Sequence, residues 1–488
     1  MLKSIVLIVS AIIKQRQLLN TLIILLLVDS SPAQDNHFIN RDQRERKPFN
    51  VILLMADDLG YGDVGFNGNS KIITPHLDQM ARDGITFDHF YAAAPLCSPT
   101  RASCLTGRSP FRQGIFAAHT GGMRPSERTL AEVVKKQGYM TGFFGKWHLG
   151  WVQADKVENR GFYSPPWHHG FDEVFATKSA VPTWNPTKTP EGWKGFGARE
   201  DGSWGGSVYI HNGEPVTDNL DGDDSRVIMD RVIPFMESAI AEGKPFLATI
   251  WFHAPHEPIA AGPEYLAKYP GLPQEQKHLY GCITAMDEQI GRLRAFLKDK
   301  GLDEDTILFF CSDNGPADPQ TKRGIASAGP FRGHKHQMWE GGLRVPALLT
   351  WPGHLQENIL CSFQTGTVDY LPTILDLLAL PAIKDRPMDG ISLVPALKGE
   401  QVERPVPLAF GYQRLYNGTE LYAFIKGKYK ICIPEKGDNM MLFDLETDPA
   451  ESKDLATSHP QLLKEMQAEL ESVKASWRNS REGKDYKW

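Results

Sequence analysis

The sequence predicts an α/β fold, in which a large, mostly parallel β-sheet is sandwiched by helices and a smaller C-terminal α+β subdomain follows. Three observations predict it. Short apolar runs alternate with helical patterns, most of these runs end in polar residues, and the pattern changes after about residue 380. We therefore place the large domain at residues 48–380 and the subdomain, with a short antiparallel sheet and a helix, at residues 381–488.

The N-terminal segment is predicted to lie outside this fold. Apolar runs at residues 5–13 and 21–28 flank basic residues, and small residues follow at 31–33, where a signal peptidase would cleave. We expect residues 1–33 to be a signal peptide and residues 34–47 a flexible leader, so that the protein is exported to the periplasm or the medium. The alternative is a membrane anchor. Neither run reaches the ~20 residues of a spanning helix, so stable membrane insertion is not expected.

Composition excludes several classes of protein. The chain has 53 basic and 59 acidic residues, a net charge of −6, and lacks a long basic tract, so nucleic acid is not expected as a partner. Six cysteines among 488 residues form neither a disulfide scaffold nor a zinc pattern. Five of them lie in apolar settings and are predicted to be core residues, although export would permit one or two disulfides. These five are Cys104, Cys282, Cys311, Cys361 and Cys432.

Four apolar runs are predicted to be buried parallel strands, at residues 50–55, 139–144, 246–252 and 306–311. An apolar stripe between residues 283 and 297 predicts one of the helices that separate them. Ligands of such sheets bind beyond the carboxyl ends of the strands, so the polar residues there are expected to meet in one crevice. These residues are Asp57 and Asp58, Lys146 and His148, His253 and His256, and Asp313 and Asn314.

The subdomain is predicted from three shorter patterns. Residues 424–430 alternate apolar and polar side chains, as in a half-exposed antiparallel strand, and residues 431–433 continue that strand. Residues 442–445 form another short strand. An apolar stripe from residue 462 to residue 473 then predicts a helix near the end of the chain.

The oxygen-bearing residues after two of the strands have the chemistry of a cation site. Asp57, Asp58, Asp313 and Asn314 offer hard oxygen ligands, which suit calcium or magnesium and not zinc. The alternative is that they cap strand ends, because Asp and Asn readily form turns. Three converging carboxylates would repel one another strongly without a cation. A divalent ion is therefore expected if the two strand ends meet.

Cys97 lies in the most informative stretch of the chain. Pro99 stands where the first turn of a helix tolerates proline and Gly107 where a helix can end, so Cys97 is predicted at a helix N-terminus, which favours an anion. An inert cysteine that begins a short helix is the alternative. The run Cys97-Ser-Pro-Thr100-Arg101, with Thr106-Gly107 beyond it, nevertheless resembles the signature of the formylglycine-dependent sulfatases. Thr100 departs from it, since serine is commoner there, and this bears on whether the maturation enzyme accepts the site.

Further blocks extend the resemblance to this family, which belongs to the alkaline phosphatase-like superfamily. They follow the order found in the family and together span about residues 49 to 455. The resemblance implies the sheet-and-helix fold of that superfamily. The blocks are residues 57–58, 145–150, 255–258, 312–315, 333–335 with 340–346, and 442–449 with Glu451.

The resemblance also implies a nucleophile and a metal site. A formylglycine-generating enzyme would oxidise Cys97 to formylglycine (3-oxoalanine), whose hydrated aldehyde attacks sulfur. One Ca²⁺ would be held by residue 97 together with Asp57, Asp58, Asp313 and Asn314. Asp313 is then the group that would accept a proton from the hydrate.

Five other residues receive roles by the same resemblance. Arg101 would orient the hydrate, and Lys146 and Lys335 would bind the sulfate, since clamping of negative charge is usually the largest catalytic term. His148 would lie near the hydrate, and His256 would protonate the leaving alcohol. The resemblance leaves His253 open, as a substrate contact or as a packed core residue.

Taken together, the sequence predicts an exported, calcium-dependent sulfatase that hydrolyses a sulfate ester, with a sulfated carbohydrate as the expected substrate. The alternatives are a phosphodiesterase or phosphonate hydrolase of the same superfamily, and a non-catalytic protein that binds sulfated glycans. The single-metal ligand set argues against two-metal phosphatases. Aromatic loops at residues 163–169, 181–193 and 203–211 are either glycan subsites or ordinary packed loops. The particular sugar, the ring position and the oligomeric state do not follow from the sequence.

Overall fold

The computed structural model describes residues 48–153, 162–401, 403–414, 417–435 and 439–486. The predicted signal peptide and leader lie outside these residues. None of the helices in the described ranges is long and apolar enough to cross a membrane.

The large domain is built around one ten-stranded sheet with the order β11-β2-β10-β9-β1-β8-β4-β5-β6-β7. Its five central strands β9, β1, β8, β4 and β5 are parallel to one another, whereas β10 pairs antiparallel with β9, β6 with β5, and β7 with β6. This confirms the predicted mostly parallel sheet. The strands run β1 (Asn50–Ala56), β2 (Ile85–Phe87), β3 (Phe90–Tyr91), β4 (Met140–Lys146), β5 (Glu173–Thr177), β6 (Ile210–His211), β7 (Glu214–Pro215), β8 (Phe246–Trp251), β9 (Thr306–Ser312), β10 (Ala347–Thr350), β11 (Ile359–Cys361) and β12 (Thr365–Gly366).

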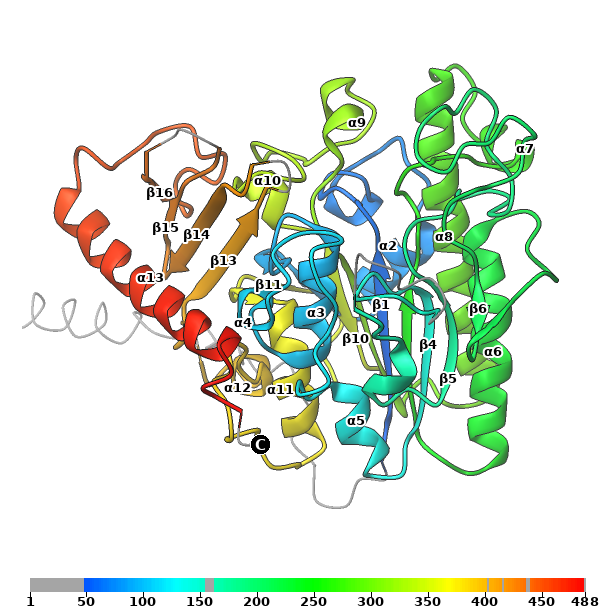
Figure 1. The fold of residues 1–488 in the computed structure, drawn as a ribbon, viewed down its shortest axis with the longest axis horizontal. Helices are drawn as coiled ribbons and strands as arrows, with labels where there is room; N and C mark the ends of the chain where they lie inside the picture. Colours follow the sequence, from blue (N-terminus) through cyan, green and yellow to red (C-terminus); the bar gives the residue numbers. More distant parts are fainter. Residues whose placement is uncertain (1–47, 154–161, 402, 415–416, 436–438, 487–488) are drawn as a thin grey trace, which may run out of the picture.

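Helices cover both faces of this sheet, as predicted (Figure 1). Side chains alternate along β1, so Leu53 packs in one core with α3, α5, α11 and α12, while Leu54 packs in the opposite core with α2, α6 and α8. Short 3-10 helices lie at Gly65–Asn67, Pro166–His169 and Thr367–Asp369. The α-helices are α2 (Pro75–Arg82), α3 (Cys97–Thr106), α4 (Pro110–Gln113), α5 (Leu130–Lys135), α6 (Asp224–Ala241), α7 (Pro263–Leu266), α8 (Gln274–Asp299), α9 (Asp318–Lys322), α10 (Glu340–Leu343), α11 (Tyr370–Leu377), α12 (Val394–Leu397) and α13 (Pro460–Arg481).

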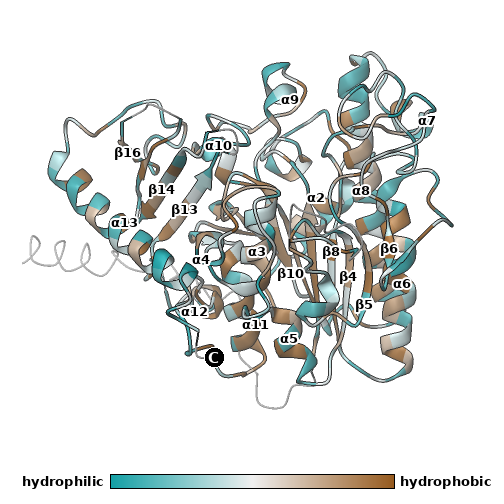
Figure 2. Cartoon of the chain, viewed as in Figure 1, coloured by the Kyte–Doolittle hydropathy of each residue, from teal (hydrophilic) through white to brown (hydrophobic). Residues whose placement is uncertain are grey.

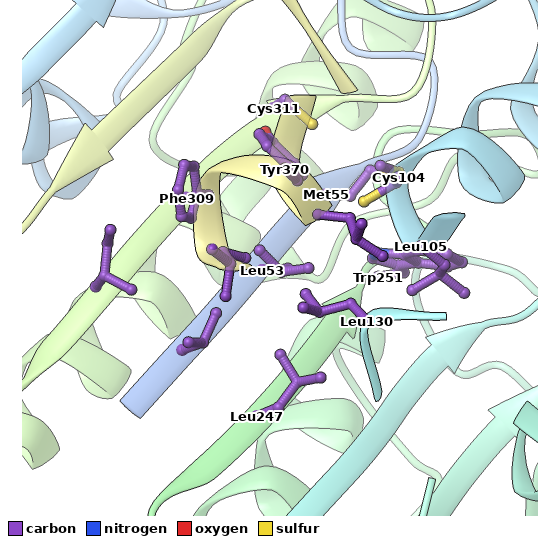
Figure 3. Close-up of a cluster of buried hydrophobic side chains, with 14 of the residues drawn as sticks. Leu53, Met55, Cys104, Leu105, Leu130, Leu247, Trp251, Phe309, Cys311 and Tyr370 are labelled. Atoms are coloured by element: carbon purple, nitrogen blue, oxygen red, sulfur yellow. The ribbon is translucent and has the colours of Figure 1, made fainter. Parts of the chain in front are cut away.

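The hydrophobic pattern explains this layering. Figure 2 shows mostly hydrophobic residues along the central strands, whereas α6, α8 and α13 carry hydrophobic and hydrophilic residues on different sides. Figure 3 shows strand residues such as Leu53 and Leu247 in one cluster with Leu105 and Tyr370, together with the sulfur atoms of Cys104 and Cys311. All six cysteines are buried and unpaired. The core prediction is therefore confirmed, and the disulfides that export would permit do not form.

The C-terminal part forms a separate four-stranded antiparallel sheet with the order β13-β14-β15-β16, and α13 covers it. The strands are β13 (Leu408–Gln413), β14 (Glu420–Lys426), β15 (Tyr429–Cys432) and β16 (Met441–Asp444). The small antiparallel sheet and the helix are as predicted.

One strand prediction in this sheet is wrong. The segment 424–433 is not one half-exposed strand, because Gly427 adopts a φ of +54° and turns the chain between β14 and β15. The five central residues of β14 are all buried. Phe424 packs toward α13, whereas Ile425 packs toward the large domain, so the alternation reflects two covered faces and not a face open to solvent.

Gly145, directly before Lys146, is required by the close approach of β4 to β8. Its φ is +102°, and a Cβ built on it would lie 1.9 Å from the carbonyl oxygen of Trp251. We predict that Gly145→Ala lowers the free energy of unfolding by roughly 2–5 kcal/mol, through backbone strain and overpacking. Urea denaturation measures this loss. Gly138→Ala is the matched control, because Gly138 has a φ of +86° but nothing within 4 Å of its Cβ position. Equal losses in the two variants would contradict the close-approach argument.

Candidate active site

The four predicted oxygen ligands lie together at the carboxyl edge of the sheet. Asp57 and Asp58 follow β1, and Asp313 and Asn314 follow its parallel neighbour β9. The backbone N–H of Asp58 donates to Asp313 Oδ1 at 3.1 Å, and Asn314 Nδ2 donates to Asp58 Oδ1 at 2.7 Å. All four side chains are buried. The convergence expected from the strand pattern is therefore present in the fold.

Three cationic side chains neutralise the three carboxylates of this group. Arg101 Nη2 lies 2.6 Å from Asp313 Oδ2, and Lys146 Nζ lies 2.5 Å from Asp57 Oδ2. The third pair joins Lys335 Nζ to the two oxygens of Asp58, at 2.5 and 2.8 Å. Every member is buried, so the positive and negative charges of the site balance before any ligand is added.

The surroundings shift the pKa values of Asp313 and Asp58 in opposite directions. Burial and the neighbouring Asp57 raise the pKa of Asp313 to about 6, although Arg101 and Lys146 oppose the shift. Burial also disfavours ionisation of Asp58. The charge of Lys335, together with smaller contributions from His256 and Lys146, outweighs the effect of burial and holds the pKa of Asp58 well below its usual range. Asp58 therefore remains ionised, whereas Asp313 is the carboxyl able to take up a proton near neutral pH.

The oxygen atoms of the site fit a divalent cation. Asp57 Oδ1 and Asn314 Oδ1 are buried and have no hydrogen-bond partner among the described residues. Such atoms are costly unless a ligand satisfies them. Strand-end capping does not explain them, since a capping oxygen would accept a backbone N–H, as Asp313 Oδ1 does. Ligand atoms of Asp57, Asp58 and His256 also lie within 4.8 Å of one another. Carboxylate and amide oxygens suit Ca²⁺ or Mg²⁺.

Cys97 begins α3, as its sequence context predicts. Leu96 precedes the helix without a side-chain cap, and Gly107 ends it with a φ of +66°. The thiol is buried. Burial raises its pKa, although Lys146 and Lys335 pull in the opposite direction. The unmodified side chain is therefore a neutral thiol and not an activated thiolate.

Arg101 joins α3 to two strand ends. Its guanidinium binds Asp313, donates from Nη1 to the backbone oxygen of Lys146 at 2.9 Å, and lies over the Trp251 ring at 5.1 Å. It is fully buried. Because it contacts the segments after β9 and β4 at once, it fixes the start of α3 relative to both.

Two predicted histidines line the same site. His256 Nδ1–H donates to the backbone oxygen of Glu257 at 2.6 Å, which leaves Nε2 3.7 Å from Asp58 Oδ2. Burial, together with Lys146, lowers the pKa of His256 to about 3. His148 follows β4 with a φ of +55°, and burial lowers its pKa well below the usual range.

His119 was not identified from the sequence. Its Nε2 lies 3.4 Å from His148 Nε2, its φ is +61°, and burial with nearby Lys178 and Lys146 lowers its pKa to about 4. It stands in a loop outside every recognised block. Only the unusual pairing of two histidines in three dimensions identifies it.

The structure decides between the alternatives for His253. The ring is fully buried, with Nδ1 2.8 Å from Asp224 Oδ2 and Nε2 2.7 Å from Thr177 Oγ1. Both nitrogens are therefore occupied by protein partners. His253 is a packed core residue that links α6, β5 and β8, not a substrate contact.

The three aromatic loops differ in their surroundings. Residues 181–193 contribute Trp184 and Trp193 to a cavity of about 790 Å³, which Glu257 also lines. Trp204 and Tyr209 of the loop 203–211 are instead buried in the core. Trp167 of the loop 163–169 packs against the opposite core. The loop 181–193 thus lines a cavity whose wall includes Glu257, the neighbour of His256. Trp167, Trp204 and Tyr209 of the other two loops pack in or against the core instead.

Comparison with known proteins agrees with this geometry. Residues 49–380 match the sulfatase family, and residues 331–476 match the family described as N-sulphoglucosamine sulphohydrolase, C-terminal. N-acetylgalactosamine-6-sulfatase of Mus musculus is 32% identical over 440 residues, covering 85% of this chain and 78% of the relative. Arylsulfatase A of Bos taurus is 32% identical over 465 residues, covering 88% of each.

A solved structure shows the same fold. The crystal structure of Ps i-CgsB in complex with k-i-k-neocarrahexaose aligns with a TM-score of 0.77 and 28% identity, covering 88% of this chain and 93% of that one. The family match spans most of the chain, and the sheet, the subdomain and the buried charged site agree with it. The chain therefore belongs to the sulfatase family of the alkaline phosphatase-like superfamily and is a sulfuric ester hydrolase.

Proposed function

We propose that this sulfatase acts on a sulfated carbohydrate, with Cys97 converted to formylglycine and one Ca²⁺ held at the edge of the sheet by Asp57, Asp58, Asp313 and Asn314. The observation that carries the proposal is the buried group of three carboxylates and three cations around the start of α3. The carbohydrate is supported by the relative of known structure that was solved with k-i-k-neocarrahexaose.

The charge balance explains why a divalent cation and an anionic ester belong together here. Three carboxylates and three cations leave the protein part of the site close to neutral. A divalent ion on the unpartnered oxygens of Asp57 and Asn314 adds two positive charges in a buried setting. A sulfate ester brings negative charge to the same place, and its transition state gains most from fixed positive charge.

Each residue then has a defined task. Formylglycine would supply the hydrated aldehyde that attacks sulfur, and Ca²⁺ would polarise the sulfate oxygens. Asp313 would accept the proton that the nucleophile releases, as the family resemblance implies. Arg101 orients residue 97, and Lys146 and Lys335 bind the sulfate oxygens. His148 lies beside residue 97 in this arrangement.

His256 is the group that protonates the leaving alcohol. Its Nδ1 proton is committed to the Glu257 carbonyl, so the proton must come from Nε2. The low pKa arises from burial and from the cations Lys146 and Lys335. A bound sulfate ester opposes those cations with its negative charge and raises the proton affinity of His256.

The first prediction concerns Cys97. In protein made together with a formylglycine-generating enzyme, mass spectrometry of the peptide that contains residue 97 should find the aldehyde or its hydrate. Cys97→Ala should lower kcat on an aryl sulfate by about 10³-fold or more, because the nucleophile is lost. Cys104→Ala, in the same helix but in the core, is the matched control and should retain turnover. Full activity with unconverted cysteine would overturn the assignment.

The same preparation distinguishes a sulfatase from a phosphodiesterase or phosphonate hydrolase. Aryl sulfate, aryl phosphonate and bis-aryl phosphate esters share a leaving group, so their kcat/KM values compare the transferred groups directly. We expect the sulfate ester to have the highest value. A higher value for either phosphorus ester would favour the alternative activity.

The second prediction concerns calcium. Adding Ca²⁺ to chelator-treated protein should stabilise it by about 2.7 kcal/mol at a hundredfold excess over Kd, seen as a rise in Tm, and should restore activity. Asn314→Leu should abolish the Tm shift, since it removes one unpartnered oxygen. Asp83→Asn, at a surface ion pair with Arg294, is the control and should retain the shift. An unchanged shift in Asn314→Leu would place the ion elsewhere.

The third prediction concerns export, which we propose from the N-terminal pattern alone. Expression with the full sequence in a secreting host should give mature protein that begins at Gln34, after cleavage of residues 1–33. N-terminal sequencing measures this. Intact Met1 on protein from the membrane fraction would instead indicate an anchor.

A further inference from the structure

A groove lies next to the active site, since its wall includes Glu257, the residue that follows His256. Its volume is about 790 Å³, within the range of ligand sites in proteins. It lies among the loop 184–193, the N-terminal end of α8 and the segment around α9. We call it the flanking groove and define it by Trp184, Lys188, Trp193, Glu257, His278 and Arg323. Figure 1 shows α7 and α9 near the same end of the molecule.

One wall residue connects the flanking groove to His256, the proposed proton donor to the leaving alcohol. Glu257, in its wall, is the residue after His256, and its backbone oxygen holds the His256 ring. The Glu257 carboxylate accepts a hydrogen bond from Gln320, the neighbouring wall residue on α9. If His256 delivers its proton to the leaving oxygen, as proposed above, the groove is the cavity next to the departing part of the substrate.

The walls combine indole rings with polar side chains. Trp184 packs edge-on against Tyr265 at 6.4 Å, and a Cβ at Gly262 would meet its ring at 2.2 Å, so the ring is held in place. Trp193 Nε1 donates to the backbone oxygen of Phe196 at 3.0 Å. Flat indole faces cover the apolar C–H faces of sugar rings, while polar side chains between them bind hydroxyl groups.

The charges of the flanking groove differ from those of the catalytic site. Lys188 pairs with Asp221 at 3.1 Å, and Arg323 pairs with Glu275 at 2.8 Å. Glu191 and Glu257 add further carboxylates to the lining. The cationic lining residues in the described chain are thus paired, and a second sulfate would face carboxylates. Neutral rings fit this surface better than sulfated ones.

We propose that the flanking groove binds the unsulfated sugar residues next to the sulfated one, so that the enzyme selects oligosaccharides in which a neutral sugar flanks the scissile sulfate ester. The inference rests on the proposed function, because it takes the leaving group of that reaction as its occupant. It adds a specificity site outside the charged centre.

Binding tests this proposal without turnover. Cys97→Ala protein is applied to an array of carrageenan, chondroitin sulfate, heparan sulfate and fucan oligosaccharides, each present in singly and multiply sulfated forms. We expect the strongest binding where an unsulfated sugar flanks a single sulfate. Adding Trp184→Ala or Trp193→Ala should weaken that binding about tenfold, as truncation of an aromatic anchor does. Phe196→Ala is the matched control, since Phe196 is an exposed aromatic residue just after this loop and does not line the groove.

Kinetic measurements distinguish a failure of the groove proposal from a failure of the proposed function. Aryl sulfate turnover reports the catalytic site alone. The ratio of kcat/KM on the bound oligosaccharide to kcat/KM on the aryl sulfate should fall about tenfold in either tryptophan variant and stay constant in Phe196→Ala. Equal ratios in all variants, preference for multiply sulfated chains, or binding to none of the oligosaccharides would overturn the groove proposal. Absence of aryl sulfate turnover would instead count against the proposed function.

Discussion

The Arg101–Asp313 ion pair is the contact on which the geometry of the site depends. It joins α3 to the residue directly after β9, and through the Lys146 carbonyl it also reaches the end of β4. Both partners are fully buried, so removing either one would strand a charge in the interior at a cost of about 3–5 kcal/mol. The second and third buried ion pairs, Lys146–Asp57 and Lys335–Asp58, would leave an unpaired buried charge in the same way if one partner were removed. Without a bound cation or substrate, the fold therefore tolerates this charge density only while all three pairs are complete.

The C-terminal subdomain supports the third of these pairs. Lys430 on β15 lies 2.9 Å from Glu340 and 2.8 Å from Glu451, all buried, and Tyr91 donates to Glu340 at 3.0 Å. Glu340 begins α10, a few residues after Lys335. The four-stranded sheet thus anchors the segment that carries Lys335, which explains why residues far apart in sequence belong to one catalytic arrangement.

The sequence predicted those features that follow a regular pattern or a recognised motif. Buried strands have a strong apolar signal, and Asp58 or Asp313 is identifiable because it follows such a strand directly. The turn at Gly427 was missed because the apolar alternation continues across it. His119 and the Asp224–His253 pair depend on tertiary contacts between distant segments, and no local pattern encodes such contacts.

The contrast between the charged site and the flanking groove follows from where each is built. The catalytic side chains stand at strand ends, on α3 and in the segment before α10, where buried ion pairs fix their positions and few substitutions preserve the charge balance. The groove is formed by the loop 184–193 and short helices, where aromatic and polar residues can change at little cost to the core. Glu257 marks the boundary, since its backbone holds His256 while its side chain lines the groove. Recognition of the flanking sugars can therefore vary independently of the chemistry performed on the sulfate.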